Sequence, residues 1–114
     1  VAFSIIGEVI ESKTGKSYEV QMKERVFVPL NMKTASIDYA SIMWNDNVAI
    51  PHQLVRGKRK PIKITDTYYN VAPAGGVNAS ISDMANWMIA LLGNRSDVIT
   101  QATLKQKLRT DAST

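Results

Sequence analysis

Apolar residues in the first 28 positions recur with the spacing of two helices. Gly15 between the two sets is typical of a residue just past a helix end, and Pro29 forbids continuation of the second helix. So short a connection makes consecutive helices antiparallel neighbours, so the pattern predicts a helical hairpin over residues 1–28. The first apolar set is Ala2, Ile5, Ile6, Val9 and Ile10, and the second is Tyr18, Met22 and Val26.

The chain is expected to turn sharply at Asn31, because asparagine enters the left-handed conformation at low cost. Residues 38–44 then predict a short helix, with the alternative that Met43 and Trp44 are loop residues that pack on the hairpin. Either way, Trp44 and the later Trp87 are interpreted as core-filling side chains.

The middle of the chain has a different texture. Six apolar residues between positions 48 and 64 flank the turn residues Arg56-Gly57-Lys58, which predicts a two-stranded β-hairpin within 48–64 with a basic tip. Residues 65–78 are loop-like, and Gly75-Gly76 there allow backbone geometry that side chains would forbid.

The clearest helix is predicted over residues 80–92. Ser80 and Asp83 have the spacing of a capping box, and Gly93-Asn94 supplies a stop. Its apolar residues share one face, interpreted as the buried one; they are Ile81, Met84, Ala85, Met88, Leu91 and Leu92. A last helix is expected over about 101–109, opened by Thr100 or Thr103 and including Leu104 and Leu108.

Composition is that of a globular chain, with 45% hydrophobic and 21% charged residues, and the length predicts a single, mainly α domain over 1–114. No apolar run is long enough for a membrane span. The chain has no cysteine, which removes thiolate chemistry and leaves the redox compartment open.

Val1 is not an initiator Met, and no capping residue precedes the helical pattern that begins there. We therefore expect the N-terminus to result from a cut in a longer chain.

The net charge of +4 is concentrated between Arg56 and Lys63. This run is interpreted as a solvated turn, with an acidic partner as the alternative. No aromatic or polar reader is interleaved with it, so nucleic-acid binding is not expected.

Several short motifs suggest chemistry that their context does not support. Lys13-Thr14-Gly15 and Tyr68-Tyr69-Asn70 spell motifs of penicillin-recognising enzymes, but the first lies at a helix end and neither has a nucleophile beside it. No Ser-x-x-Lys occurs in the chain. His52 is the only histidine and is interpreted as a surface or hydrogen-bonded residue. We therefore expect no catalytic residue, cofactor or metal here.

Two ordered blocks of sequence cover about residues 1–93. The first contains the sequences GEVIE, GKSY and ERVFVPLNM, from Gly7 to Met32. The second is PAGGVNASISDMANW, from Pro73 to Trp87. Together the blocks resemble the superfamily of class C β-lactamases, D-alanyl-D-alanine carboxypeptidases and family VIII esterases, which are penicillin-recognising serine hydrolases, with Asn31 in place of the usual glycine.

The resemblance implies that the chain is most of the all-helical lobe of the serine β-lactamase-like fold, a fragment whose partner is the parent's α/β lobe. The catalytic Tyr-x-Asn and Ser-x-x-Lys would precede Val1, and the Lys/His-x-Gly strand would follow Thr114. The segment Ala74, Gly75 and Gly76 would face the substrate. The parent would hydrolyse a β-lactam, a D-Ala-D-Ala peptide or an ester, in the periplasm or outside the cell.

Two hypotheses stay open at this stage. In the first, the chain is an inactive scaffold and substrate-site wall of such a hydrolase, and it self-associates through the face that the missing lobe would cover. In the second, it is a helical interaction module without an enzymatic parent. Flanking reading frames that contain or lack the missing motifs discriminate between the two.

Overall fold

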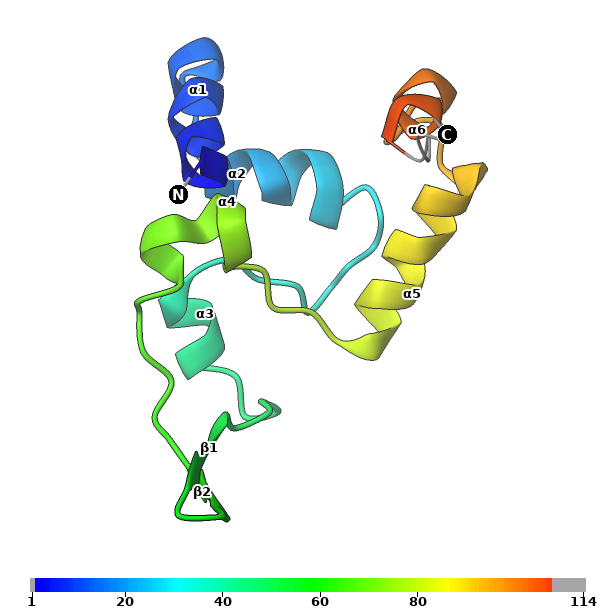
Figure 1. Ribbon diagram of the computed structural model, residues 1–114. Helices are drawn as coiled ribbons and strands as arrows, with labels where there is room; N and C mark the ends of the chain where they lie inside the picture. Colours follow the sequence, from blue (N-terminus) through cyan, green and yellow to red (C-terminus); the bar gives the residue numbers. More distant parts are fainter. Residues whose placement is uncertain (1, 108–114) are drawn as a thin grey trace, which may run out of the picture. The chain divides into compact units, whose positions relative to one another are not determined.

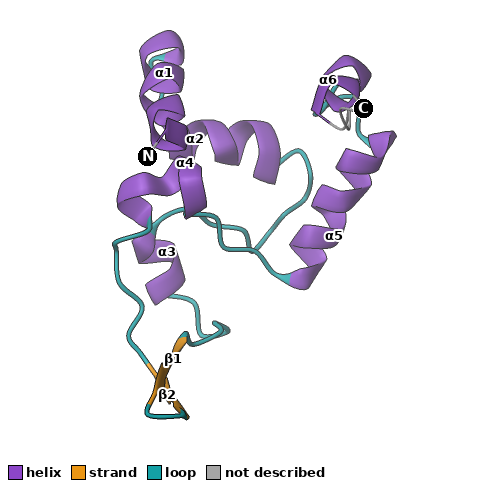
Figure 2. Cartoon of the chain, viewed as in Figure 1, coloured by secondary structure: helices purple, strands orange, loops and turns teal. Residues whose placement is uncertain are grey.

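The computed structural model of the chain describes residues 2–107, and helices account for most of them (Figures 1 and 2). The α-helices are α1 (Ile5–Thr14), α2 (Tyr18–Met22), α3 (Tyr39–Met43), α4 (Ala72–Gly75), α5 (Ile81–Ile89) and α6 (Gln101–Lys107). Shorter 3-10 turns are η1 (Ala2–Ser4) and η3 (Tyr69–Val71), and π-helical turns are η2 (Lys23–Phe27) and η4 (Ala90–Asn94). Strands β1 (His52–Val55) and β2 (Lys58–Pro61) form one antiparallel pair. The predicted mainly α fold with a small hairpin is confirmed.

The described chain divides into two compact units, each assembled from two stretches of sequence. Unit 1 comprises residues 1–19 and 36–78, and unit 2 comprises residues 20–35 and 79–114. The boundary between residues 19 and 20 falls inside α2. Both helices of the predicted hairpin over residues 1–28 are present, and their antiparallel packing, like the single domain over 1–114, stays a prediction.

Unit 1 is held together by close approach of α1 and α4, which lie side by side in Figure 1. A Cβ added to Gly7 of α1 would lie 2.9 Å from the Pro73 ring, so only glycine lets the two backbones come this near. At its other end α1 stops as predicted at Gly15, whose φ is 68° and whose amide donates to the Glu11 carbonyl.

The second stretch of unit 1 begins and ends at one β-bridge. Ser36 and Asn78 exchange both backbone hydrogen bonds, at 3.0 and 2.8 Å, and Ile37 beside them is buried. The predicted short helix follows as α3, whose N-cap Asp38 accepts a hydrogen bond from the Ser41 amide at 2.8 Å. The interpretation of Trp44 as a core residue is wrong: it is 88% exposed at the C-cap of α3.

The β-hairpin occurs within the predicted range. Its two-residue turn is Arg56-Gly57, with φ values of 50° and 77°, and two positive φ angles are what a tight hairpin turn of this length needs. His52 pairs with Pro61 and Val55 with Lys58.

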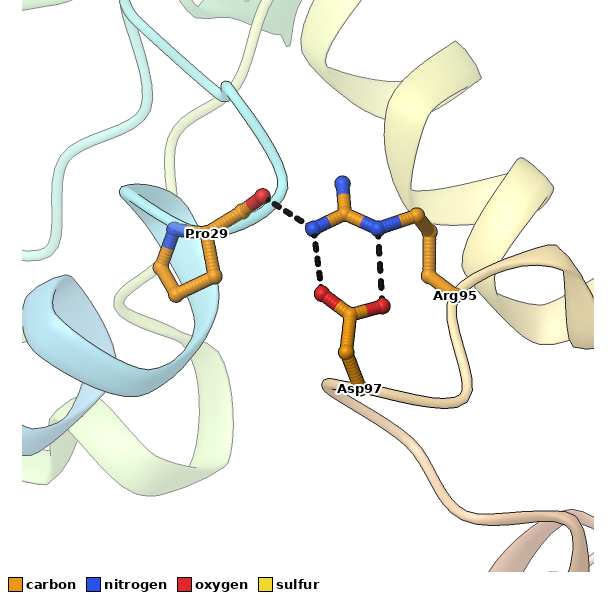
Figure 3. A network of polar contacts seen from close by, with 3 residues as sticks. All are labelled: Pro29, Arg95 and Asp97. Carbon is orange, nitrogen blue, oxygen red and sulfur yellow. Dashed lines mark hydrogen bonds and ion pairs between the residues drawn. The ribbon is translucent and has the colours of Figure 1, made fainter.

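In unit 2, the helix that begins at α2 ends in the π-helical turn η2, where the Val28 amide donates to the Lys23 carbonyl five residues earlier. Leu30 is almost fully buried, and Asn31 takes the predicted left-handed conformation with φ 57°. The Pro29 carbonyl at this helix end accepts a hydrogen bond from Arg95 at 2.6 Å (Figure 3). The same guanidinium makes two parallel bonds to Asp97, at 2.7 and 3.0 Å, which fix the direction of the fork.

Helix α5 begins with the predicted capping box, because the Ser80 side chain accepts from the Asp83 amide and Asp83 accepts from the Ser80 amide. It continues into η4 and stops at Gly93, whose φ is 88°. The predicted last helix is α6, opened by Thr100, whose hydroxyl accepts from the Thr103 amide at 3.2 Å. Leu104 of α6 is buried; Leu108 and the rest of the predicted range to 109 lie outside the described residues.

The face that α5 buries is the opposite of the predicted one. Asp83 and Ala90 are buried and Trp87 is half-buried, whereas the apolar stripe points away from unit 2. Hydrogen bonds from Thr34 tie the Asp83 side of α5 to the earlier stretch of unit 2, and the apolar residues on the opposite side of the helix therefore face out. The exposed members are Ile81 at 86%, Leu92 at 74%, Met88 at 50% and Met84 at 42%.

Candidate functional site

The segment that the resemblance placed beside the substrate, Ala74-Gly75-Gly76, forms the end of a short helix in unit 1. The prediction of a loop is wrong here: Ala74 and Gly75 lie in α4, and Gly76 caps it with φ −87°. Glycine is required at position 76 because there is no space for a side chain. A Cβ at Gly76 would lie 2.8 Å from the Ala72 Cα and 3.0 Å from its Cβ, closer than packed atoms come.

The two sides of this segment differ in environment. Ala72 and Gly76 are buried, so the segment rests on the interior of unit 1. Ala74 and Gly75 are exposed, and a Cβ added to Gly75 would meet no atom within 4 Å. The segment is thus anchored on one side and leaves open space on the other, in which another molecule can approach the backbone.

Asn78 links the segment to other polar side chains of unit 1. The Asn78 amide donates to the Tyr69 hydroxyl at 2.8 Å, and at 3.5 Å to the Ser36 hydroxyl and the Gly76 carbonyl. The Tyr69 ring lies 6.0 Å from that of Tyr39, and Tyr39 donates to the Ile64 carbonyl at 3.4 Å. Sequence reasoning named Tyr69 only within the Tyr68-Tyr69-Asn70 motif and did not assign these side-chain contacts, because most of them join residues 9 to 42 positions apart and leave no local pattern.

The two short motifs whose context does not support chemistry lie at a helix end and at an exposed turn. Lys13-Thr14-Gly15 lies at the end of α1, and the Thr14 hydroxyl donates to the Ile10 carbonyl at 2.7 Å. Tyr68 is 68% exposed. The Nδ1 atom of His52 lies 2.8 Å from the Ile50 carbonyl oxygen on the exposed hairpin, a contact that accounts for this histidine as predicted.

Burial, followed by the neighbouring charge of Glu19, raises the pKa of Tyr18, so its phenol stays protonated at neutral pH. Within residues 2–107, no three histidine, cysteine or carboxylate side chains come together as metal ligands. None of the helices in this range is both long enough and apolar enough to cross a bilayer.

Comparison with known proteins identifies the family. The family model described as Beta-lactamase matches residues 1–114, so the chain belongs to the Beta-lactamase family, a family of serine hydrolases. It is 32% identical over 85 residues to the D-aminopeptidases of Brucella canis and Brucella abortus, an alignment that covers 75% of the chain. The chain spans only 16% of the length of these relatives.

Two solved structures have a similar fold. The octameric penicillin-binding protein homologue from Pyrococcus abyssi is 21% identical, with a TM-score of 0.76 over 90% of this chain and 23% of its own. The D-amino acid amidase from Ochrobactrum anthropi SV3 is 19% identical, with a TM-score of 0.65 over 90% of this chain and 32% of its own. The fold is therefore a helical piece of the serine β-lactamase-like fold, as the resemblance implied.

Proposed function

We propose that this chain is the helical wall of a larger serine hydrolase, and that α4 with Gly76 forms one side of the acyl site. In the whole protein a serine hydroxyl adds to a carbonyl of the substrate, the amine or alcohol leaves, and water then hydrolyses the acyl-enzyme. The chain itself has no Ser-x-x-Lys, so the nucleophile and its base come from other residues of the parent.

The observation that carries this proposal is the one-sided anchoring of Ala74-Gly75-Gly76 in a chain of this family. A segment that lines a substrate site must be held rigidly on its protein side and leave space on its substrate side, because a displaced segment no longer orients the substrate. Gly76 packs against Ala72 behind, and no atom lies near Gly75 in front. Both properties support a role for this segment in shaping the acyl pocket.

The substrate carbonyl belongs to a β-lactam, a D-Ala-D-Ala peptide or an ester. The names of two similar proteins, a D-aminopeptidase and a D-amino acid amidase, add amides of D-amino acids to the panel. Hydrolysis of matched D- and L-amino acid amides by the whole protein is the first assay. Turnover of the L-series alone would contradict a D-specific peptide or amide substrate.

The partner of this chain in the whole protein is the parent's α/β lobe. The exposed stripe of α5 supports this, since exposed apolar patches in soluble proteins usually mark an interaction surface. Ile81 and Leu92 on this stripe are 86% and 74% exposed. In the isolated chain the same stripe favours self-association.

Incubation of the isolated chain with a fluorescent penicillin tests the absence of a nucleophile. We expect no covalent adduct after denaturing electrophoresis, with a penicillin-binding enzyme as positive control. A stoichiometric adduct would show that a residue of this chain attacks the ring.

A reading frame with Ser-x-x-Lys upstream and Lys/His-x-Gly downstream supports the enzymatic parent. The absence of both motifs favours the non-catalytic interaction module.

Substitution of Gly75 in the whole protein tests the wall itself. Gly75→Leu fills the open side of α4 and is expected to raise KM for bulky acyl groups more than for small ones. Met43→Leu, which changes an exposed position on α3, is the matched control. Equal kinetics of both variants for all acyl groups would remove Gly75 from the site.

A periplasmic or external location of the whole protein is part of the same proposal.

A further inference from the structure

The net positive charge of the chain comes from the β-hairpin and the residues beside it. Between Asn47 and Thr65 there is no aspartate or glutamate, and five cations stand in this stretch: Arg56, Lys58, Arg59, Lys60 and Lys63. Outside it the chain has nine cations and ten anions, so the net charge of +4 arises entirely here. Such concentration produces a local positive potential that the net charge alone understates.

The side chains that carry these charges are exposed to solvent. Every residue from His52 to Lys63 is exposed, including the whole of β1 and β2. Among the residues that the structure describes, no carboxylate forms an ion pair with any of the five hairpin cations; the pair of Arg95 and Asp97 belongs to unit 2. A surface that serves solubility alone usually mixes both signs of charge.

Apolar side chains of β1 lie opposite cations of β2. Directly opposed residues share a face, so Leu54 lies beside Arg59 on one face and Val55 beside Lys58 on the other. Leu54 is 68% exposed, and the flanking Ile50 and Ile62 are 59% and 44% exposed. A packed hairpin would bury one face; this one leaves apolar and cationic side chains outside on both.

We propose that the hairpin is a peripheral docking surface for an anionic lipid bilayer. Arginine and lysine bind lipid phosphates, Arg59 with the geometry of a two-pronged donor, while Leu54 on the same face as Arg59 enters the level of the headgroups. Nucleic acid fits less well, because no aromatic side chain is available in the hairpin for stacking on bases.

Sedimentation of the 114-residue chain with vesicles tests the proposal. We expect binding to phosphatidylcholine vesicles that contain phosphatidylglycerol, weak binding to pure phosphatidylcholine, and release by high salt. Each cation near such a surface contributes roughly five-fold to the partition coefficient, so Lys58→Gln with Arg59→Gln and Lys60→Gln should lower it about 100-fold. The matched control removes three exposed lysines elsewhere, namely Lys13, Lys33 and Lys105.

A second pair of variants separates lipid from other polyanions. Leu54→Ser is expected to weaken vesicle binding roughly ten-fold, since its apolar side chain leaves water on insertion. Val28→Ser, at a site 66% exposed in unit 2, should change nothing. Binding to a single-stranded oligonucleotide that is at least as tight as to vesicles and insensitive to Leu54→Ser would overturn the lipid assignment. Equal vesicle binding by the triple hairpin variant and its control would overturn the docking surface altogether.

Discussion

Thr34 and Asp83 are joined across 49 residues of sequence, with both the amide and the hydroxyl of Thr34 donating to the Asp83 carboxylate. The same carboxylate accepts from the Ser80 amide at 3.1 Å and from the Ser80 hydroxyl at 2.9 Å. Asp83 is only 3% exposed. One buried carboxylate therefore closes the first turn of α5 and also holds the earlier stretch of unit 2 against it.

Replacement of Asp83 by asparagine should be the most damaging single polar substitution in unit 2. In Asp83→Asn the side-chain amide keeps one acceptor oxygen and places a donor opposite other donors, so we expect a loss of about 2 kcal/mol in the free energy of unfolding. Urea unfolding followed by circular dichroism measures it. Asp46→Asn, at an exposed site, is the control; an equal effect of both would show that Asp83 has no special role.

The stability of the chain should depend on pH through the same group. Burial alone would raise the pKa of Asp83, but hydrogen bonds from Thr34 and Ser80 outweigh it and hold the pKa below the ordinary value of 3.8. Because the folded pKa is the lower one, the stabilisation is complete above 3.8 and is lost as the pH falls through the folded pKa. In the Thr34→Val variant, the loss of stability as the pH falls should be smaller. An unchanged acid transition in that variant would contradict the assignment.

Adjacent glycines at the end of α4 should respond in opposite directions. Gly76→Ala forces a methyl group against Ala72, and we expect a cost of about 1–3 kcal/mol from overpacking. Gly75→Ala adds its methyl group to open space within a helix, where it should be neutral or stabilise by about 0.5 kcal/mol. Thermal unfolding of both variants checks the pair. A reversed order would mean that Gly76 does not pack on Ala72.

Asn31 offers a stabilising substitution. Its φ of 57° costs a side-chain residue about 1 kcal/mol relative to glycine, so Asn31→Gly should stabilise unit 2 and Asn31→Ala should destabilise it. The Asn31 carbonyl, which accepts from the Asn86 amide at 3.1 Å, is retained in both variants. Urea midpoints of the three proteins give the order directly, and a glycine variant less stable than the alanine variant would contradict the conformational argument.

Self-association of the isolated chain should depend on the exposed stripe of α5. Ile81→Ser with Leu92→Ser removes its two most exposed members and should shift light scattering at high concentration towards the monomer. Leu54→Ser, in the hairpin, is the control for loss of a similarly exposed leucine. A monomeric wild-type chain at high concentration would remove the basis of this prediction.

Local signals were sufficient to predict most elements of the fold, but not α4. Ser80 with Asp83, Gly15, Asn31 and the Arg56-Gly57 turn each act through their own backbone or that of near neighbours, and the structure places all of them as the sequence predicts. Two predictions about which side chains are buried are wrong, one at Trp44 and one along α5. The apolar stripe of α5 turns outward, and periodicity cannot say which of two faces a unit buries when Asp83 fixes the opposite one.

The candidate site was predictable only as a segment. Ala74, Gly75 and Gly76 came from the resemblance, whereas their helical geometry depends on packing and on contacts distant in sequence. Gly76 packs on Ala72, and Asn78 reaches Tyr69 through an amide that no local rule assigns. Residue type and spacing therefore locate the segment, and tertiary contacts decide its shape.

The interleaving of the two units has a consequence for limited proteolysis. A tryptic cut at the exposed Arg56-Gly57 turn would produce two peptides, and each would carry parts of both units. Neither peptide holds both partners of the Ser36–Asn78 bridge or of the Thr34–Asp83 contact. The nicked chain should therefore survive as a non-covalent complementation pair, and separation of its halves should unfold both units at once.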